Sequence, residues 1–172
     1  MNETNSHQAT PFDERMAGIL NHAALALSIS IGHRTGLFDT IARLGPATSD
    51  QIAHAASLSE RYVREWLGAM VTGGIIEYDP TDRSFHIPAD HIPFLTRTET
   101  SSNLASGMQW IPLLGRVEDE VLAAFQHGKG VTYEAYHRFH DVMAEESTQT
   151  VVAGLKQHII PFVPGLQERQ AC

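Results

Sequence analysis

Apolar residues recur every three or four positions from Phe12 onward, which is the spacing of an amphipathic helix. The stripe that they form consists of Met16, Ile19, Leu20, Ala23, Leu27 and Ile31. Ala24 and Ile29 widen it beyond one side, so we expect this helix to be buried on most sides. Gly32 and Gly36 supply stops for the helix. The extra apolar face favours a second subunit as its cover, and a helix central to its own monomer is the alternative.

A helix, a turn, a second helix and a hairpin are predicted between residues 48 and 87. Thr48 and Gln51 have the spacing of a capping box, which starts the first helix. The second helix begins after Ser59, and Gly73-Gly74 ends it. Its inner face is formed by Val63, Trp66, Leu67 and Met70. Two strands follow, at residues 75–79 and 84–87. This order predicts a winged helix-turn-helix, and the fold class is mainly α with a small β-hairpin wing.

Further helices are predicted on both sides of this motif. Before it, a short amphipathic helix over residues 37–44 turns Leu37, Phe38, Ile41 and Leu44 inward. After it come helices joined by polar loops, at residues 90–95, 108–126, 134–147 and 148–160. We therefore divide the chain into a disordered N-terminus (1–11), a winged helix-turn-helix domain (12–96) and a helical linker or lid region (97–172).

Composition narrows the class of protein. The 172 residues are 42% hydrophobic, enough to build a core, and carry a formal net charge of −8. The single cysteine, Cys172, permits no disulfide within the chain, which fits a reducing cytoplasm. No basic segment followed by an apolar run opens the sequence, so no signal peptide is expected. Because the longest mainly apolar stretch, residues 23–31, is too short to span a bilayer, we predict a cytoplasmic protein without membrane contact.

The helix-turn-helix pattern raises the question of DNA binding. Between residues 48 and 87, acidic residues outnumber basic ones: Asp50, Glu60, Glu65, Glu77, Asp79 and Asp82 against Arg61, Arg64 and Arg83. Phosphate contacts supply much of the affinity for DNA, so this charge balance argues against a nucleic-acid partner. A stand-alone winged-helix transcriptional regulator, with a helical extension that binds an effector, stays open as the alternative function.

Six segments of the sequence point to a particular protein family. They are residues 25–39 (LALSISIGHRTGLFD), 47–53 (ATSDQIA), 61–67 (RYVREWL), 73–78 (GGIIEY), 109–114 (QWIPLL) and 138–147 (RFHDVMAEES). Together they resemble the N-terminal region of bacterial class I S-adenosylmethionine-dependent methyltransferases, over roughly Phe12 to Glu168. The resemblance implies a winged-helix domain that forms a homodimer and covers the active site. It also implies a helical linker, followed by a Rossmann-like domain that binds S-adenosylmethionine.

The cofactor-binding part of that layout is not found in this sequence. A Rossmann-like domain needs a strand, a glycine-rich turn and a helix. The closely spaced glycines of residues 127–130 join two predicted helices instead. The resemblance therefore implies an N-terminal fragment, from a truncated or split gene, that partners a missing or separate Rossmann-like domain. Alone, the chain is expected neither to bind the cofactor nor to transfer a methyl group, and a functionless gene remnant is a further possibility.

Candidate substrate contacts fall in the predicted linker. Four residues share one helical stripe by spacing: Tyr136, Phe139, His140 and Met143. They either pack a core, or the missing domain, or form a lid over the acceptor pocket. If they form a lid, His140 could accept the proton of a hydroxyl group as the methyl group is transferred. Met108, Trp110 and Tyr133 could add apolar walls, although no motif assigns a catalytic base.

A metal site is not predicted. His137, Asp141 and Glu145 repeat every four residues, as ligands on one helical face would. A solvated face with pairs four residues apart explains them equally well, and no further ligands lie at a coherent spacing.

Overall fold

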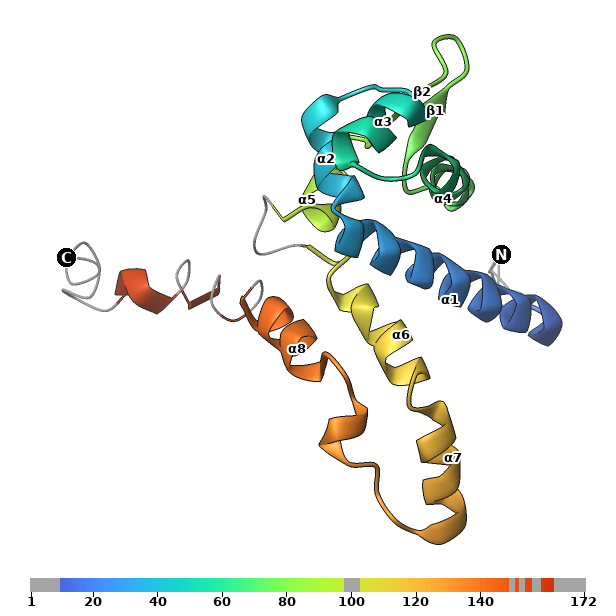
Figure 1. The fold of residues 1–172 in the computed structure, drawn as a ribbon, viewed down its shortest axis with the longest axis vertical. Coiled ribbons are helices and arrows are strands. Elements are labelled where there is room, and N and C mark those ends of the chain that lie inside the picture. Colours follow the sequence, from blue (N-terminus) through green and yellow to red (C-terminus); the bar gives the residue numbers. More distant parts are fainter. Residues whose placement is uncertain (1–9, 98–102, 149–150, 152–153, 156–158, 163–172) are drawn as a thin grey trace, which may run out of the picture.

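The computed structural model describes residues 10–97, 103–148, 151, 154, 155 and 159–162. The elements of the winged-helix region are α1 (Phe12–Thr35), α2 (Leu37–Leu44), α3 (Ser49–Ala56), α4 (Glu60–Thr72), β1 (Glu77–Asp79), β2 (Ser84–His86) and α5 (Ile92–Leu95). Those of the following region are η1 (Gly107–Gln109), α6 (Trp110–Gly115), α7 (Glu118–His127), η2 (Tyr133–Ala135), α8 (Phe139–Ser147) and η5 (Ile160–Phe162). Figure 1 shows the winged-helix elements on one side of α1 and the chain from α6 to α8, here called the arm, on the other. Most of the segment predicted to be disordered (1–11) and most of the predicted helix at 148–160 lie outside the described residues.

The winged helix-turn-helix prediction is confirmed. Strands β1 and β2 pair antiparallel with Tyr78 opposite Phe85, and Ala47 bridges to Phe85 from the other side. One apolar cluster fills the space between α1, α2, α3, α4 and the wing, and its largest fully buried side chains include Phe38, Ile41, Ile52, Leu67 and Met70. Leu44 departs from the prediction, because it is 40% exposed at the end of α2 rather than turned inward.

The helix starts and stops follow local side-chain chemistry. The hydroxyl of Thr48 accepts from the Gln51 backbone N–H, and the Gln51 side chain accepts from the Thr48 N–H, which is the predicted capping box. Ser59 stands at the start of α4 without a side-chain cap. Gly74 takes a left-handed φ of 69°, which lets the chain reverse towards the wing.

Gly32 does not stop the first helix, contrary to the sequence prediction. Helix α1 continues to Thr35 and ends at Gly36, whose φ is 71°. Gly32 lies at the crossing of α1 with α4, where a methyl group would overlap the ring of Trp66. The Trp66 indole N–H donates to the Ser28 carbonyl at 2.8 Å. The glycine is therefore needed for close approach of the two helices, not for a turn.

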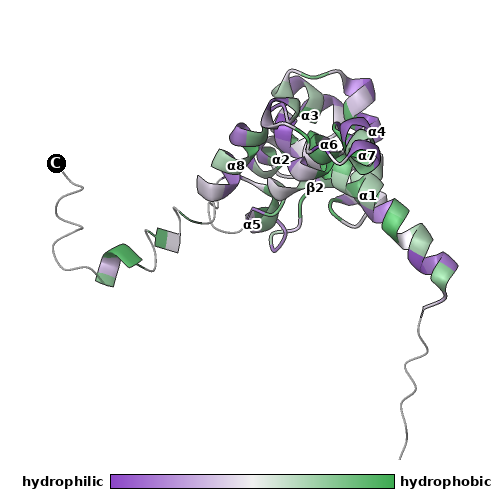
Figure 2. Ribbon diagram, turned by 90° about the horizontal axis from the view of Figure 1, so that it is seen from below, coloured by the Kyte–Doolittle hydropathy of each residue, from purple (hydrophilic) through white to green (hydrophobic). Residues whose placement is uncertain are grey.

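The predicted apolar stripe of α1 faces away from the rest of the chain. Its large residues are exposed, namely Phe12, Met16, Ile19, Leu20, Leu27 and Ile31. The domain packs on another side of the helix, through Ile29 and Gly32. Figure 2 shows the N-terminal half of α1 projecting from the packed helices. The prediction of a helix buried on most sides is thus wrong for the single chain.

Helix α1 also corrects the estimate of apolar length. The helix has 24 residues and contains an 18-residue window with a mean hydropathy of 1.2, so by length and composition alone it could cross a membrane. Its last turns carry Ile29, Ser30 and His33 into the folded domain. That end therefore belongs to the core of the folded domain.

Two predicted long helices of the arm are each divided. The stretch predicted at 108–126 breaks at Gly115–Val117, where a glycine of low helix propensity precedes a buried valine. The stretch predicted at 134–147 becomes η2 and α8, because Arg138 takes a left-handed φ of 68°. The arm folds back along itself at the loop between α7 and η2 (Figure 1).

Candidate functional site

Five of the seven predicted site residues gather in one aromatic cluster, centred on Phe139. Ring centroids lie 5.3 Å from Phe139 for Trp110, 5.7 Å for Tyr133, 6.1 Å for Tyr136 and 5.6 Å for His140, all in edge-to-face geometry. Tyr133 is 73% exposed, so the cluster opens to solvent on one side. Such a cluster can pack or bind a flat apolar group.

The single helical stripe that suggested this cluster does not exist. Tyr136 precedes α8 and has non-helical backbone angles, and Arg138 separates it from the helix. The tyrosine reaches Phe139 through the bend rather than through helical spacing. The structure brings these rings together, but not through the predicted helical spacing.

Met108 and Met143 are not part of the aromatic cluster's ring contacts. Met108 lines a separate apolar cavity of about 280 Å³, together with Ile29, Ile75, His91, Phe94, Leu95 and Leu104. Met143 is 42% exposed on α8. The cavity lies between the winged-helix core and the start of the arm.

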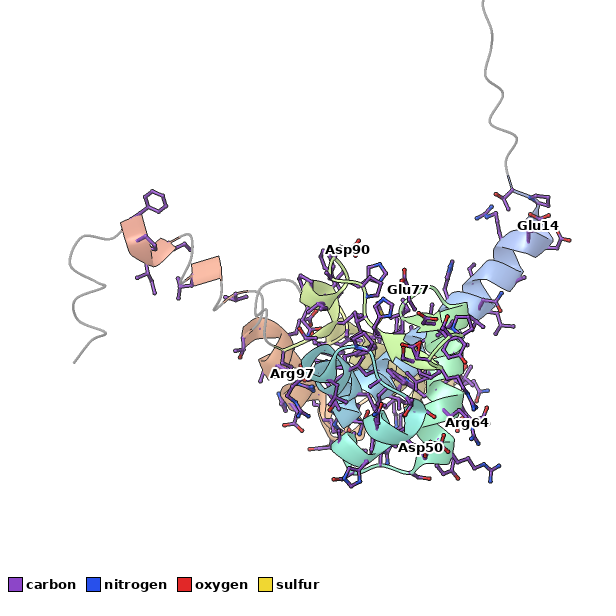
Figure 3. All side chains as sticks on the ribbon, turned by 90° about the horizontal axis from the view of Figure 1, so that it is seen from above. Glu14, Asp50, Arg64, Glu77, Asp90 and Arg97 are labelled. Atoms are coloured by element: carbon purple, nitrogen blue, oxygen red, sulfur yellow. The ribbon has the colours of Figure 1, made fainter. Side chains whose placement is uncertain are left out.

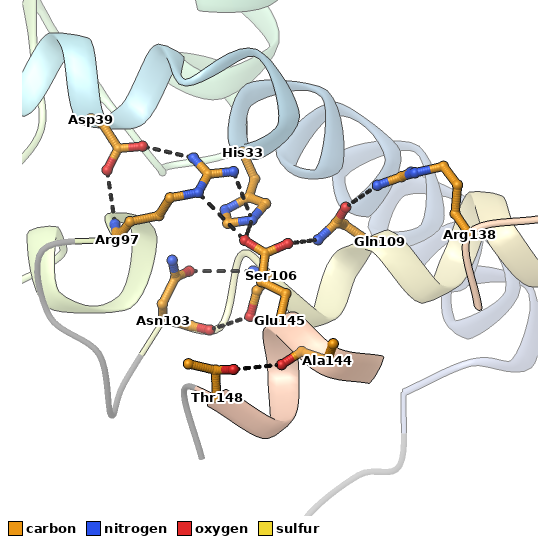
Figure 4. Close-up of polar contacts among 10 residues, drawn as sticks. All are labelled: His33, Asp39, Arg97, Asn103, Ser106, Gln109, Arg138, Ala144, Glu145 and Thr148. Atoms are coloured by element: carbon orange, nitrogen blue, oxygen red, sulfur yellow. Dashed lines mark hydrogen bonds and ion pairs between the residues drawn. The ribbon is translucent and has the colours of Figure 1, made fainter. Parts of the chain in front are cut away.

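A polar network, which the sequence did not suggest, joins the arm to the winged-helix region (Figure 4). His33 on α1 donates from Nε2 to Glu145 Oε1 at 2.8 Å, and Gln109 donates from Nε2 to Glu145 Oε2 at 2.7 Å. Arg97 Nε lies 3.4 Å from Glu145 Oε1. Three elements far apart in sequence therefore meet on one carboxylate.

The network extends on both sides of Glu145. Arg97 makes a two-point contact with Asp39 on α2, through its backbone N–H and its Nη1, each at 2.8 Å. Arg138 donates from Nη2 to Gln109 Oε1 at 2.8 Å. Beside it, the Trp110 indole N–H donates to Glu146 Oε2 at 2.7 Å, which links the network to the aromatic cluster.

Burial sets the charge states in the network. Burial lowers the pKa of His33, and the Arg97 guanidinium acts in the same direction against the hydrogen bond to Glu145. For Glu145, burial acts to raise the pKa, but hydrogen bonds from Gln109 and His33 outweigh it and the pKa lies below its ordinary value. The geometry thus holds a neutral imidazole against an ionised carboxylate.

The tautomer of His33 follows from these contacts. A neutral imidazole carries one N–H, and the carboxylate at 2.8 Å from Nε2 requires that proton there. Nδ1 is then a buried acceptor, and within the described residues it has no hydrogen-bond partner. The Arg97 Nη2, 3.1 Å from Nε2, is a close charged neighbour rather than a donor to it.

The residues considered for a metal face are arranged differently. His137 lies before α8, and Glu145 is engaged by His33 and Gln109. In the part of the chain that the structure describes, no group of three potential ligands gathers.

The winged helix-turn-helix segment that would meet DNA carries acidic side chains beside its arginines. Arg64 on α4 pairs with Glu60 at 3.4 Å, and Glu60 also accepts from Ser49 at 2.8 Å. Figure 3 shows Asp50, Glu77 and Arg64 on the outer surface of the winged-helix region. Acidic side chains therefore stand among the cations that phosphate contacts would need.

Sequence reasoning missed His33, Arg97, Gln109 and Glu145 as a group. A histidine inside an apolar helix signals a buried polar contact, but nothing in the spacing names its partner 112 residues away. Glu145 was grouped with His137 and Asp141 on a solvated face. Only the fold brings α8 onto α1.

The winged-helix class is supported by comparison with known families. Residues 23–97 match the family described as the Rv2258c-like winged HTH domain. Residues 23–97 are thus similar to a winged helix-turn-helix domain of this type. No curated protein sequence matches the chain.

Solved structures extend the likeness beyond the winged helix. The mitomycin 7-O-methyltransferase MmcR matches with a TM-score of 0.63 at 17% identity, over 84% of this chain and 44% of its own. Human N-acetylserotonin methyltransferase, in complex with SAM, matches with a TM-score of 0.60 at 13% identity, over 83% and 44%. RosA from Streptomyces davawensis, a dimethyltransferase of an amino-riboflavin, matches with a TM-score of 0.59 at 16% identity, over 86% and 46%.

These matches establish a shared fold. The chain spans less than half the length of each of these three methyltransferases, matched over their N-terminal part. At such identities, the fold and not the chemistry is what carries over.

Proposed function

We propose that this chain is the N-terminal dimerisation and active-site-lid portion of an S-adenosylmethionine-dependent methyltransferase that acts on a small molecule. The carrying observation is the extent of the structural match. A winged helix used only as a DNA reader would match over residues 23–97, whereas the methyltransferases match 83 to 86% of the chain, which is more than those residues make up. The cofactor-binding domain is then supplied by residues or a chain outside this sequence.

The apolar face of α1 supports the dimerisation role. Phe12 is 71%, Ile19 59% and Leu20 72% exposed along one stripe, and apolar surface of this extent is normally covered by a partner. A second copy of the same helix is the occupant that we propose. The homodimer then uses α1 and the winged-helix domain, with the division near residue 96 separating it from the lid.

The aromatic cluster supports the lid role. Trp110 and Phe139 supply apolar walls, and the exposed Tyr133 leaves one side open towards a domain that would hold the acceptor. His140 lies at the edge of this cluster with an exposed side chain, so it is our candidate base. Tyr136 belongs to the same wall, whereas Met108 and Met143 would contact an acceptor only at its margins.

Photolabelling tests the proposal. The native species that carries this domain is immunopurified from its source cells and irradiated with radiolabelled S-adenosylmethionine. We expect label on the purified species, and none on the 172-residue chain made alone. A purified species that takes no label but binds duplex DNA in a salt-dependent manner, weakened by Arg61→Ala and Arg64→Ala, would contradict the proposal and favour the regulator.

A further inference from the structure

Helix α8 rests on the rest of the molecule through few buried apolar groups. Val142 is the residue of α8 that is fully buried, at 1% exposure, whereas Met143 faces solvent. The polar contacts are more numerous, because Glu145 and Glu146 together reach His33, Arg97, Gln109 and Trp110. Contacts to charged groups are the stronger class of hydrogen bond.

We propose that Glu145 is a positioning residue: its carboxylate, held by His33, Gln109 and Arg97, fixes α8 and the aromatic cluster against the winged-helix region. The position of α8 depends only on these contacts. The role of the aromatic cluster as a wall of an acceptor pocket rests on the proposed function.

The Glu145 carboxylate controls the docking of α8 because its two donors, His33 and Gln109, are buried. The His33 side chain is 0% exposed and Gln109 is 1% exposed, while the Glu145 side chain is 29% exposed. Both donors would lose their partner if α8 moved away, and a buried donor without an acceptor is costly. A glutamate on a solvated face would create no such cost.

The aromatic cluster follows α8 because it is built on the same helix. Phe139 begins α8, and its ring is 5.3 Å from that of Trp110 on α6. Glu146, next to Glu145, holds the Trp110 indole at 2.7 Å. A release at Glu145 would therefore loosen the indole contact and separate the rings.

Proton binding at His33 would weaken this docking. Among the described residues, the charged groups that face His33 are Glu145 on α8, Arg97 after α5 and Asp39 on α2. The docked state holds the pKa of His33 below its ordinary value, so at mildly acidic pH the released state binds more protons. Docking is then strongest above about pH 6.5 and weakens as the pH falls, and the lowered pKa of Glu145 extends the loss further into acid.

Hydrogen exchange of the full chain tests the positioning role. Glu145→Ala should raise amide exchange in α8 by about tenfold or more, since a hydrogen bond to a charged group is lost, and should leave α3 and α4 unchanged. Asp141→Asn, which removes one charge from an exposed site of the same helix, should change α8 exchange by less than about threefold. Equal exchange in α8 of wild type and Glu145→Ala would overturn the proposal.

The pH profile provides a readout that a merely structural role would not move. The NMR signal of the Trp110 indole N–H is followed from pH 8 to 5. We expect a titration in the wild type that is lost in His33→Gln, because the glutamine can donate to Glu145 and does not bind a proton in this range. A titration that persists in His33→Gln would come from another group and would overturn the proposal. Because His33→Gln keeps the donor, the pH measurement tests the proposal even if Glu145→Ala does not fold. Neither experiment depends on methyl transfer.

Discussion

The winged-helix region and the arm have similar helix content but are held by different forces. The first is organised around one apolar cluster that includes fully buried Phe38, Ile41, Ile52 and Leu67. The arm buries few side chains: α7 has no fully buried residue and α8 has Val142. The arm is held instead by the polar network around Glu145 and by the aromatic cluster around Phe139. A region that buries little apolar surface opens locally at low free-energy cost, so we expect the arm to open before the winged-helix core does.

The largest expected effect breaks the apolar side of this comparison. Trp66→Ala should cost about 3–5 kcal/mol in the free energy of unfolding, because it leaves a cavity at the crossing of α1 and α4 and removes the indole hydrogen bond to the Ser28 carbonyl. Urea titration followed by circular dichroism measures this loss. Tyr62→Ala, on the same helix but at a side chain 73% exposed, should cost under about 1 kcal/mol. Similar losses would show that the crossing is not central to the core.

The uncovered stripe of α1 gives the next effect. Leu20→Asp places a charge on the exposed apolar face, so it should convert a homodimer into a monomer in light scattering. His22→Asp introduces the same charge on the opposite side of the helix and should leave the mass unchanged. A wild-type monomer, or a dimer unaffected by Leu20→Asp, would refute the proposed dimer face.

An aromatic substitution sharpens the contrast from the side of the arm. Phe139→Ala removes the ring that contacts Trp110 and three other rings, so amide exchange in α8 should rise by roughly tenfold. The urea midpoint of the winged-helix region should stay the same. Phe125→Ala, at a side chain 86% exposed on α7, is the matched control and should change neither quantity. A loss of global stability in Phe139→Ala would mean that the two regions unfold as one.

The smallest effect tests local helix chemistry. Thr48→Ala should cost about 1 kcal/mol, because the capping box of α3 loses its acceptor for the Gln51 N–H. Ser59→Ala should cost close to nothing, since that side chain makes no cap hydrogen bond. Thermal unfolding compares the two variants, and a larger loss at Ser59 would reverse the assignment of the caps.

The same division decides how far the sequence could predict the structure. Local rules predicted the capping box at Thr48, the inner face of α4 and the wing, because each depends on neighbours within a few residues. The orientation of α1 was predicted wrongly. An apolar stripe indicates that one face of a helix will be buried, but it does not indicate which element packs against that face. In the arm, the left-handed Arg138 divided a helix that the apolar spacing treated as continuous.

The candidate site was predictable in part. Tyr136, Phe139 and His140 are close in sequence, so their spacing suggested one cluster, whereas Trp110, on another predicted helix, was added for its residue type alone. The contact between His33 and Glu145 spans 112 residues and depends on the packing of α8 onto α1. Spacing along one helix carries no information about such a contact.

The mass of the native species that contains this domain, measured after immunopurification from its source cells, tests the central claim most directly. The account predicts that each protomer of 18.9 kDa is accompanied by about 150–200 further residues, the size of one cofactor-binding domain. These residues lie either in the same chain or in a bound partner chain. A species of 18.9 kDa protomers with no further chain would contradict it.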